Sequence, residues 1–177
     1  STPFSVTETT PVGVRIALAG QPDMAALGTA LHLCIARAAA LGRLEPAEVA
    51  HILRQWGVAN AVTQAAVEAQ LKAFSDWCQQ RWPGCPRLVE VPLEATRPDG
   101  TRLRGRIDML IQTPQGWVLI DHKSNPGGSA RDDALAQEHG PQLAAYAQAL
   151  HAATGLPVLE QWLYLPVGAR LLRLQST

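Results

Sequence analysis

Two acidic residues and a lysine near the middle of the chain are the residues best suited to chemistry. Asp108 lies in the stretch Gly105–Ile111, and Asp121 and Lys123 follow the apolar run Trp117–Ile120. Two carboxylates suit Mg²⁺, which binds through one or two carboxylates and keeps waters and substrate phosphates at its other positions. An ammonium beside such a site can orient or help deprotonate a metal-bound water. The pattern therefore predicts a divalent-cation site with an activated water.

A β-hairpin is the element that would position these residues. Segment 113–116, Thr-Pro-Gln-Gly, joins two apolar runs and has Pro and Gly where tight turns favour them. If the loop has two residues, Asp108 falls opposite Asp121, with their Cβ atoms about 5 Å apart, and Lys123 lies on the same strand face. A three-residue loop with a bulge at Gly116 would instead turn Asp108 to the opposite face.

The charges of this hairpin have a structural and a functional interpretation. Asp and Lys at strand ends are common on solvated faces, where they need no function. Facing carboxylates repel, however, so stability alone does not favour a pair of them. Asp121 also follows the apolar run Val118–Ile120, where a charge needs a partner. A cation between Asp108 and Asp121 removes both objections.

The composition indicates a globular chain of one domain. It has 177 residues, of which 47% are hydrophobic and 17% charged, which is enough to bury a core. No run approaches the roughly 20 apolar residues of a membrane span, and no signal-peptide pattern opens the chain. We therefore expect a cytoplasmic protein with no membrane partner.

Net charge and cysteine content limit the kinds of site. The 15 basic and 15 acidic residues give a formal net charge of +0. If the chain binds DNA, a local basic patch or another domain must therefore provide the binding surface. The cysteines are odd in number and lack C-x-x-C spacing; they are Cys34, Cys78 and Cys85. We expect packed thiols rather than a disulfide framework, a zinc site or an iron–sulfur cluster.

The first half of the chain is expected to be a linker followed by helices. Residues 1–21 are rich in Thr, Pro and Gly and predict a linker or arm from a larger protein, with a short strand at Val12–Ala19. The start at Ser1 rather than Met favours a piece of something longer. The region from about residue 24 to about residue 82 is expected to be helical. The predicted helices are Met24–Leu41 after a cap at Asp23 or Gln21, Pro46–Trp56, and a third from a cap at Asn60 to Trp82.

The second half, about 87–174, is expected to be the sheet core. Ser124–Glu138 is typical of a mobile loop. A helix is expected to start at Gly140-Pro141 and to end at Gly155, since Pro suits the first helical position. Beside the hairpin, the predicted strands are Arg87–Thr96, Thr101–Thr113, Leu156–Tyr164 and Ala169–Leu174.

Several charged residues of the sheet core are further candidates. Glu90 and Glu94 are four apart and so share a predicted strand face. The next strand carries a line of alternating charged residues that leads to the predicted cation site: Arg102, Arg104, Arg106 and Asp108. Such a line fits either a phosphate track or a solvated strand edge.

Two predicted helices carry polar candidates. Gln142 and Tyr146 are four apart and therefore neighbours on one helix face. His32 lies among small residues, Gly28 and Thr29, which would let something approach its imidazole closely. A helical His taken alone is also explained as a packed or surface residue.

The order of these fragments resembles the RecB-like nuclease domain of the PD-(D/E)XK superfamily, found at the C-terminus of UvrD/RecB-type helicase–nucleases. The resemblance covers roughly residues 26–164. Its motifs are His32 in G-T-A-L-H, Glu90 in V-E-V-P, Asp108 in G-R-I-D, Asp121 with Lys123 in L-I-D-H-K, and Gln142 with Tyr146 in Q-L-A-A-Y. It implies an α/β fold over residues 22–177, with a restriction-endonuclease-like core of a central mixed β-sheet flanked by helices and an N-terminal helical region.

The resemblance also implies the roles of the residues at the cation. His32, Asp108 and Asp121 would be metal ligands for Mg²⁺ or Mn²⁺. The main-chain carbonyl of His122 would be a further ligand. Lys123 would position and activate the attacking water.

Other roles follow from the same resemblance. Glu90 would be an accessory acid of the site, with Glu94 as the alternative. Gln142 and Tyr146 would lie near the substrate backbone. The charged line itself, taken as a phosphate track, adds two arginines as predicted substrate contacts: Arg104 and Arg106.

The function implied is metal-dependent hydrolysis of DNA phosphodiesters, as an exonuclease within an ATP-dependent helicase–nuclease of double-strand-break repair and recombination. The sequence has no GxxxxGK[ST] loop, so ATP would be used only by a separate helicase domain. The expected partners are DNA, motor domains of the same parent chain and another protein of the complex as a second subunit. Relatives with an iron–sulfur cluster use cysteines after the Tyr helix, which this sequence lacks.

Two other functions fit the same fold. One is a catalytically inactive scaffold or DNA-binding module within a helicase complex. Retention of the His, both Asp and the Lys argues against it, since a site freed from chemistry need not keep costly buried charges. The other is a site-specific endonuclease, for which the sequence offers no recognition domain.

Overall fold

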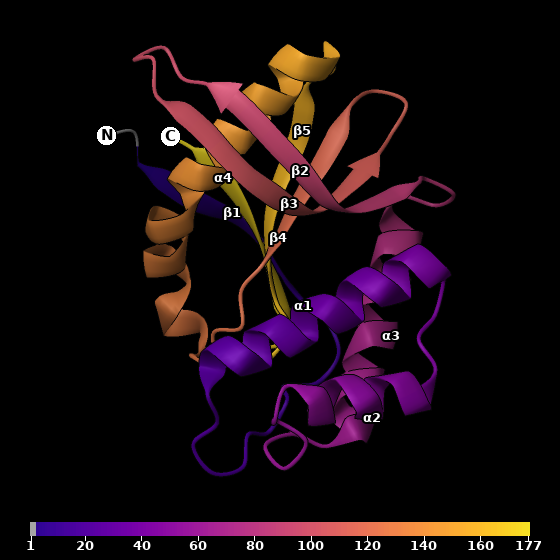
Figure 1. Cartoon of the computed structure of the whole chain (residues 1–177). Helices are drawn as coiled ribbons and strands as arrows, with labels where there is room; N and C mark the ends of the chain where they lie inside the picture. Colours follow the sequence, from indigo (N-terminus) through magenta and orange to yellow (C-terminus); the bar gives the residue numbers. More distant parts are fainter. Residues whose placement is uncertain (1–2) are drawn as a thin grey trace.

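A computed structural model describes residues 3–177 and shows a six-stranded sheet with helices on both faces (Figure 1). Ser1 and Thr2, part of the predicted linker, lie outside the described residues. The strands are β1 (Phe4–Pro11), β2 (Arg87–Thr96), β3 (Arg102–Gln112), β4 (Trp117–His122), β5 (Val158–Leu165) and β6 (Arg170–Ser176). The helices are α1 (Met24–Leu41), α2 (Pro46–Gln55), α3 (Gln64–Arg81) and α4 (Asp132–Thr154), with a 3₁₀ turn at Ser129–Arg131. The predicted α/β class with a mixed sheet is confirmed.

The sheet has the strand order β1-β6-β5-β4-β3-β2. Only β4 and β5 pair in parallel, because α4 carries the chain from the end of one to the start of the other. The other neighbouring strands pair antiparallel. At the carboxyl end of β4, Asp121 and His122 pair only with β5, because the ladder with β3 ends at the pair of Met109 and Ile120.

Helices cover both faces of β4. Val118 and Ile120 pack with Phe74 of α3 on one face, and Leu119 packs with Leu143 of α4 on the other. Burying such an apolar side chain contributes about 1.5–3 kcal/mol. All six residues of β4 are buried, so whatever follows Ile120 is held on a well-packed strand.

Helix α1 spans the predicted residues 24–41. The Asp23 carboxylate caps it by accepting hydrogen bonds from the main-chain N–H groups of residues 25 and 26. Within residues 3–177, α1 is the one helix long and apolar enough to cross a membrane by length and composition. In this structure its Leu27 and Leu31 are buried in a cluster with α2 and α3. It therefore serves as a core helix here, and it carries His32 to the sheet.

The hairpin between β3 and β4 has the two-residue loop. The main-chain groups of Thr113 and Gly116 bond to each other in both directions, and Met109 pairs with Ile120. One step further in this register, Asp108 lies opposite Asp121. The two-residue alternative is thus the one that the structure adopts.

The prediction of a linker at the N-terminus is wrong for the residues that form β1. This strand pairs with β6 at the edge of the sheet, while the strand predicted at Val12–Ala19 is irregular chain. The Phe4 ring packs against α4 at Gly140, where a β-carbon would collide with it. Thr, Val and Phe are common in strands, so the composition of β1 agrees with this tertiary contact; the prediction of a linker instead followed the neighbouring Pro and Gly residues.

Two helix starts also differ from the predictions. α4 begins at Asp132, so the second half of the expected mobile loop is helix and Pro141 lies inside it. An interior Pro costs a helix about 3 kcal/mol, which burial of Leu135 and Leu143 offsets. α3 is capped by Thr63, whose hydroxyl accepts from the Ala66 N–H, rather than by Asn60.

Candidate active site

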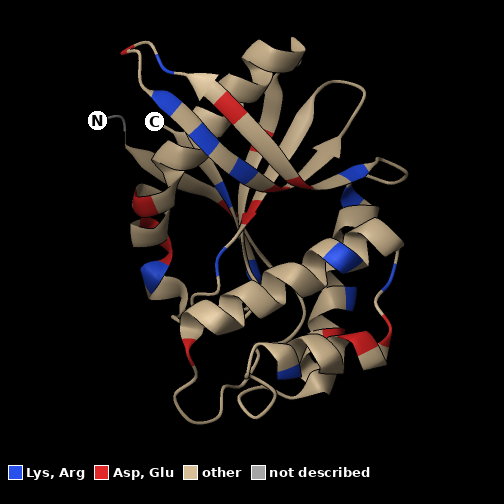
Figure 2. Ribbon diagram, in the orientation of Figure 1, with Lys and Arg blue, Asp and Glu red and all other residues tan. Residues whose placement is uncertain are grey.

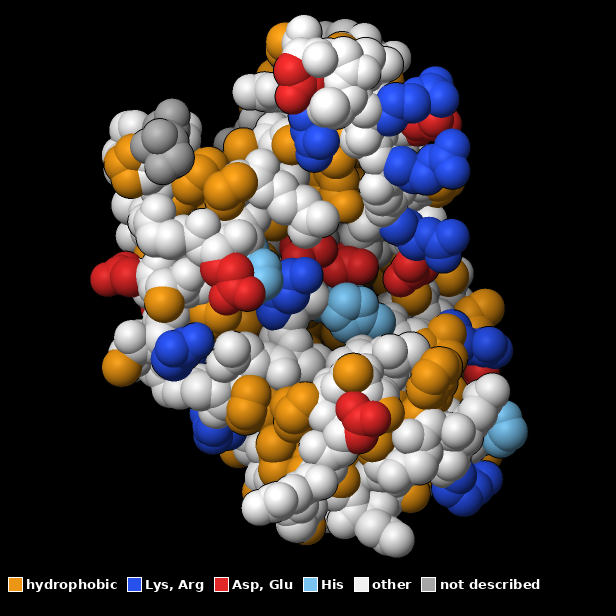
Figure 3. Space-filling view, turned by 60° about the vertical axis from the view of Figure 1, so that its left-hand side comes forward, with side chains coloured by type: hydrophobic (Ala, Val, Ile, Leu, Met, Phe, Trp, Pro, Cys, Tyr) orange, Lys and Arg blue, Asp and Glu red, His pale blue; other side chains and the backbone are white. Residues whose placement is uncertain are grey.

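Polar side chains from α1, β3 and β4 meet in a hollow between the helices and the sheet. Figure 3 shows acidic, basic and imidazole side chains gathered there on an otherwise mixed surface. His32 comes from α1, Asp108 from β3 and Asp121 from β4. Lys123 is the first residue after β4, held by its N–H bond to the Tyr164 carbonyl of β5. The sequence predicted this set, and the fold brings it together.

His32 joins the helical layer to the acid pair. Its Nε2 lies 2.8 Å from the main-chain oxygen of His122, and its Nδ1 lies 3.5 Å from Oδ1 of Asp108. Burial lowers the pKa of His32, but the hydrogen bond and negative charge of Asp108 outweigh burial, so that the pKa is raised. The imidazole therefore faces the two oxygen donors predicted to share a cation with it.

The two carboxylates are buried and close together. Asp108 is 9% exposed and Asp121 is 6% exposed. Burial and the facing Asp108 carboxylate raise the pKa of Asp121 to about 7, against the lowering effect of Lys123. Burial also raises the pKa of Asp108. The hydrogen bond with His32 and the charge interaction with His122 lower it by more, so that this pKa lies below its usual range. Without a cation the pair therefore keeps one proton near neutral pH.

Asp108 and Asp121 are tied into the site in different ways. Oδ2 of Asp108 accepts a hydrogen bond of 2.8 Å from the His122 N–H, which fixes this carboxylate against β4. Oδ2 of Asp121 lies 3.3 Å from the Lys123 Nζ but has no hydrogen-bond partner of good geometry. A buried carboxylate oxygen left in this way is costly unless another group binds it.

The donor set fits a small divalent cation. Within residues 3–177, no three His, Cys, Asp or Glu side chains are arranged as a ready-made metal cage. One of the donors here is instead main chain, the His122 carbonyl, 2.8 Å from the His32 ring. Two adjacent ligands of an octahedral Mg²⁺ at 2.0–2.1 Å lie about 3 Å apart. The imidazole, the carbonyl and the pair of carboxylates, one with an unpartnered oxygen, therefore match what Mg²⁺ or Mn²⁺ would need.

Glu90 is better placed than Glu94 to act at this site. The pairs Val89 with Met109 and Val91 with Ile107 place Glu90 opposite Asp108 in the same register. Glu94 pairs instead with Arg104, on the part of the strand away from the acid pair. The geometry favours Glu90 among the two alternatives.

The backbone at Glu90 is unusual. Its φ of 51° is one of two positive values among the non-glycine residues described. Across it the strand changes sides, since Val89 packs under α3 and Val91 packs under α4. Such strain costs on the order of 1–3 kcal/mol and concentrates at functional sites.

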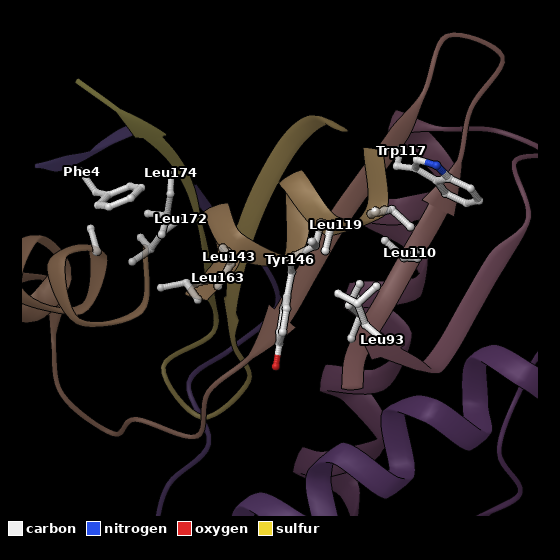
Figure 4. Packing of buried hydrophobic residues seen from close by; sticks show 14 of the residues in the cluster. Phe4, Leu93, Leu110, Trp117, Leu119, Leu143, Tyr146, Leu163, Leu172 and Leu174 are labelled. Carbon is white, nitrogen blue, oxygen red and sulfur yellow. The ribbon is translucent and has the colours of Figure 1, made fainter. Parts of the chain in front are cut away.

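Tyr146 and Gln142 reach the site from α4. Figure 4 shows the Tyr146 ring leaving the apolar cluster with its hydroxyl beyond the packed leucines. Gln142 donates a hydrogen bond of 3.1 Å to that hydroxyl. Burial and then the negative charges of Asp121 and Asp108 raise the pKa of Tyr146. The pair therefore lies near the acid pair, and its predicted position beside the substrate backbone stays a prediction.

Gly105 is a residue of the site region for which sequence reasoning gave no reason. A β-carbon at Gly105 would collide with the Tyr146 hydroxyl. A glycine inside a strand often marks such a close approach, and that signal was present in the sequence. Gly105 thus links the G-R-I-D motif on β3 to the Q-L-A-A-Y motif on α4.

A buried ion pair, also missed by sequence reasoning, holds the loop after Lys123. The Arg170 guanidinium donates to Asp132 at 2.6 and 2.9 Å and to the carbonyls of Gly127 and Gly128, each at 3.1 Å. Arg170 is the first residue of β6 and Asp132 the first of α4. The pair fixes where α4 begins relative to the end of β4. No local motif marks it, because its partners are 38 residues apart.

The predicted arginines lie along the exposed side of β3 and form ion pairs with glutamates of β2. Arg106 lies 3.6 Å from Glu90, and Arg104 lies 3.3 Å from Glu94. The sequence placed them in one line toward Asp108, and their shared face is confirmed. Their contact with a substrate stays a prediction.

A separate cavity of about 390 Å³ lies between α1, α3 and the sheet. Ile35, Leu71 and Phe74 are among its lining residues, and none of the acidic residues of the hollow is. Charged residues such as Lys72 and Arg87 line it as well. The residues predicted to carry the chemistry therefore lie outside this cavity, in the hollow.

Comparison with known proteins identifies relatives. The family described as the PD-(D/E)XK nuclease superfamily matches residues 12–177. A protein of Desulforudis audaxviator named as a subunit of an ATP-dependent helicase/nuclease is 34% identical over 93 residues, which are 50% of this chain and 8% of that protein. The proteins of the same name from Pelotomaculum thermopropionicum and Clostridium novyi are 34% and 31% identical over 45% and 44% of this chain, and over 6% of each relative. The chain thus spans a small fraction of the length of these relatives.

Proposed function

Because this chain belongs to the PD-(D/E)XK nuclease superfamily, we propose that it is a metal-dependent nuclease domain that hydrolyses DNA phosphodiester bonds. The observation that carries the proposal is the convergence of His32, Asp108 and Asp121 with the ammonium of Lys123. These groups come from segments about ninety residues apart in the chain. The burial of the two carboxylates is costly unless a cation or a shared proton compensates it.

The ligands that would hold the ion are the two carboxylates, the His32 imidazole and the His122 carbonyl. When bound, Mg²⁺ or Mn²⁺ would draw charge off a phosphate and lower the pKa of a bound water. Asp121 must lose the proton that the acid pair retains, and a cation favours this loss. The hydrogen bond from the His122 N–H keeps Asp108 in place during this exchange.

Lys123 is proposed to orient the attacking water. Asp121 holds its ammonium at 3.3 Å, at the edge of the acid pair where a phosphate would approach. As a cation it can also stabilise charge that develops on the phosphoryl oxygens. Glu90, opposite Asp108, is the accessory acid in this scheme. Tyr146 and Gln142 border the acids and would contact the substrate backbone.

The setting in a larger protein is also proposed. The relatives are named as subunits of ATP-dependent helicase/nucleases, which favours a nuclease domain that acts beside helicase motor domains. We extend this to an exonuclease that processes double-strand breaks in the cytoplasm, partnered by a second subunit. ATP would be consumed by the motor and not by this domain.

The test is a cleavage assay with linear DNA in Mg²⁺, in Mn²⁺ and in EDTA. We expect metal-dependent degradation by the wild type and loss of at least about a thousandfold in Lys123→Ala, with the fold unchanged by circular dichroism. Arg54→Ala, on the exposed side of α2, serves as a matched control that keeps activity. Full activity in Lys123→Ala, or equal activity in EDTA, would contradict the proposal.

The scaffold alternative makes the opposite prediction. A nuclease-fold module that only supports a helicase would bind DNA without cleaving it in either metal. Circular DNA separates the site-specific endonuclease, which would cut it, from an exonuclease, which needs an end.

A further inference from the structure

We propose that the outer half of the β2–β3 ribbon binds the backbone of one extended DNA strand, with Glu94 as a counter-ion that the DNA displaces. This surface, the outer ribbon, comprises residues 92–96 of β2 and 102–106 of β3. The inference rests on the proposed function, because the outer ribbon leads to the acid pair. It goes further in naming the form of the substrate and a residue that opposes its binding.

The spacing of the arginines matches a nucleic-acid backbone. Alternate residues on a strand lie about 7 Å apart on the same face, comparable to the separation of successive phosphates in an extended strand. The guanidinium groups that repeat at this spacing on β3 are those of Arg102, Arg104 and Arg106. The next position in the row is Asp108. One strand laid along the row would therefore present its next phosphate to the acids.

The face that carries these arginines is open. Leu103 and Ile107 point to the other side and pack in the cluster covered by α4. Figure 2 shows repeated basic bands along β3, beside an acidic band on β2, in the part of the ribbon that lies away from α1, α2 and α3. The arginine side chains are 64–79% exposed. A ligand can thus reach the whole row without a rearrangement of the fold.

The partners of the arginines are weak and can be exchanged. Glu94 serves two of them, at 3.5 Å from Arg102 and 3.3 Å from Arg104. Such exposed ion pairs contribute about 0–1 kcal/mol. A phosphate offers the same guanidinium groups a stronger, bidentate partner. Glu94 therefore keeps the row in order without DNA and competes with DNA for it.

The burial of the acids favours a single strand over a duplex. Asp108 and Asp121 lie at the base of the hollow, with α1 on one side and α4 on the other. A scissile phosphate must come within a few ångströms of a cation held by these carboxylates. One strand is narrow enough to descend from the outer ribbon to that depth. A duplex of full width would meet the flanking helices first.

Binding of a labelled oligothymidylate tests the inference, measured by fluorescence anisotropy in EDTA so that no cleavage occurs. Glu94→Gln is expected to bind about threefold more tightly, because it releases two guanidinium groups from competition. Arg104→Ala is expected to bind about fivefold more weakly and to reduce the slope of log K against log salt by about 0.7. Arg54→Ala, an exposed arginine away from the outer ribbon, should match the wild type in both measures.

Weaker binding by Glu94→Gln, or unchanged binding by Arg104→Ala, would overturn the inference. Equal affinity for a blunt duplex with the same dependence on Arg104 would overturn its single-strand part. The proposed function fails separately. If the wild type cleaves DNA and Arg104→Ala binds the oligothymidylate normally, the nuclease function stands and the outer ribbon is not the binding surface. If binding depends on Arg104 but the wild type never cleaves DNA, the outer ribbon stands as the binding surface and the nuclease function is wrong.

Discussion

The two halves of the β2–β3 ribbon differ in how their charged side chains are exposed to solvent and paired. In the inner half, Asp108 is 9% exposed and faces Asp121, which is 6% exposed, so that like charges are buried together. In the outer half, the arginines are 64–79% exposed and each lies beside a glutamate. One ribbon thus contains a buried carboxylate that needs compensating partners and exposed charges that hardly affect stability.

The difference indicates where function constrains the fold most. Exposed ion pairs cost little to keep or to lose. Buried like charges must share a proton or bind a cation, and both needs constrain the fold around them. The inner half is therefore the expected site of catalysis. The outer half is suited to reversible binding of an anionic ligand.

The largest effect is expected on DNA cleavage, which should depend on the inner half of the ribbon far more than on the outer half. Asp108→Ala removes a metal ligand and the acceptor of the His122 N–H, so we expect cleavage to fall by about a thousandfold or more and stability to fall by about 2 kcal/mol. Glu94→Ala in the outer half should change kcat less than about twofold. Cleavage kinetics and urea unfolding of both variants measure this. Comparable losses in both would break the distinction between the two halves.

The next effect is the pH dependence of stability. The pKa of Asp121 is raised to about 7 in the fold, from about 3.9 in an unfolded chain. The folded state then binds more protons between these values, so this contribution to stability is fully present below about pH 4 and is lost as pH rises through 7. Relative to Asp121→Asn, the metal-free wild type should lose up to about 1.4 kcal/mol per pH unit within this window.

Urea unfolding of both proteins in EDTA between about pH 4.5 and 8 measures that difference. Added Mn²⁺ should flatten the pH dependence of the wild type, since the cation replaces the retained proton. Parallel curves for the two proteins in EDTA would show that Asp121 is not perturbed by its neighbour.

A smaller effect is expected at Gly105, within the outer ribbon. Gly105→Ala would press a methyl group into the Tyr146 hydroxyl and should cost about 1–3 kcal/mol. Tyr146→Phe in the same chain removes the hydroxyl and should recover part of that loss. Thermal unfolding of the single and double variants measures the coupling. Additive effects would mean that the two side chains do not meet.

The smallest effect is expected for the outer-half ion pairs themselves. Arg104→Ala should change the free energy of unfolding by at most about 0.5 kcal/mol, because the pair with Glu94 is exposed. Urea unfolding at low and high salt checks this. A loss above about 2 kcal/mol would mean that the outer half is structural.

The site was largely predictable from sequence because its parts are local motifs. The two-residue loop fixed the register that sets Asp108 against Asp121, and period-two alternation gave the arginine row. Ordered motifs added His32, whose position on α1 no local rule connects to β4. The left-handed backbone of Glu90 could not be read in advance, because it follows from the way the ribbon changes sides between two helical layers.

The fold was predictable where local signals and tertiary contacts agree. The bounds of α1 and β2 match the prediction to the residue. β1 was missed although its Phe, Val and Thr residues are common in strands, because its pairing with β6 and its contact with Gly140 are distant in sequence. The start of α4 was misplaced because Pro141 resembles a first helical residue, while buried Leu135 extends the helix backwards.

Calorimetric titration with Mn²⁺ tests whether His32, Asp108 and Asp121 together hold a cation. The wild type should bind Mn²⁺ at one site and release about one to two protons per ion near pH 6.5, because the cation displaces the proton of the acid pair and that of the His32 imidazole, whose pKa is also raised. Asp121→Asn should lose this site while Arg54→Ala keeps it. Equal binding by Asp121→Asn, or no binding by the wild type, would contradict the account.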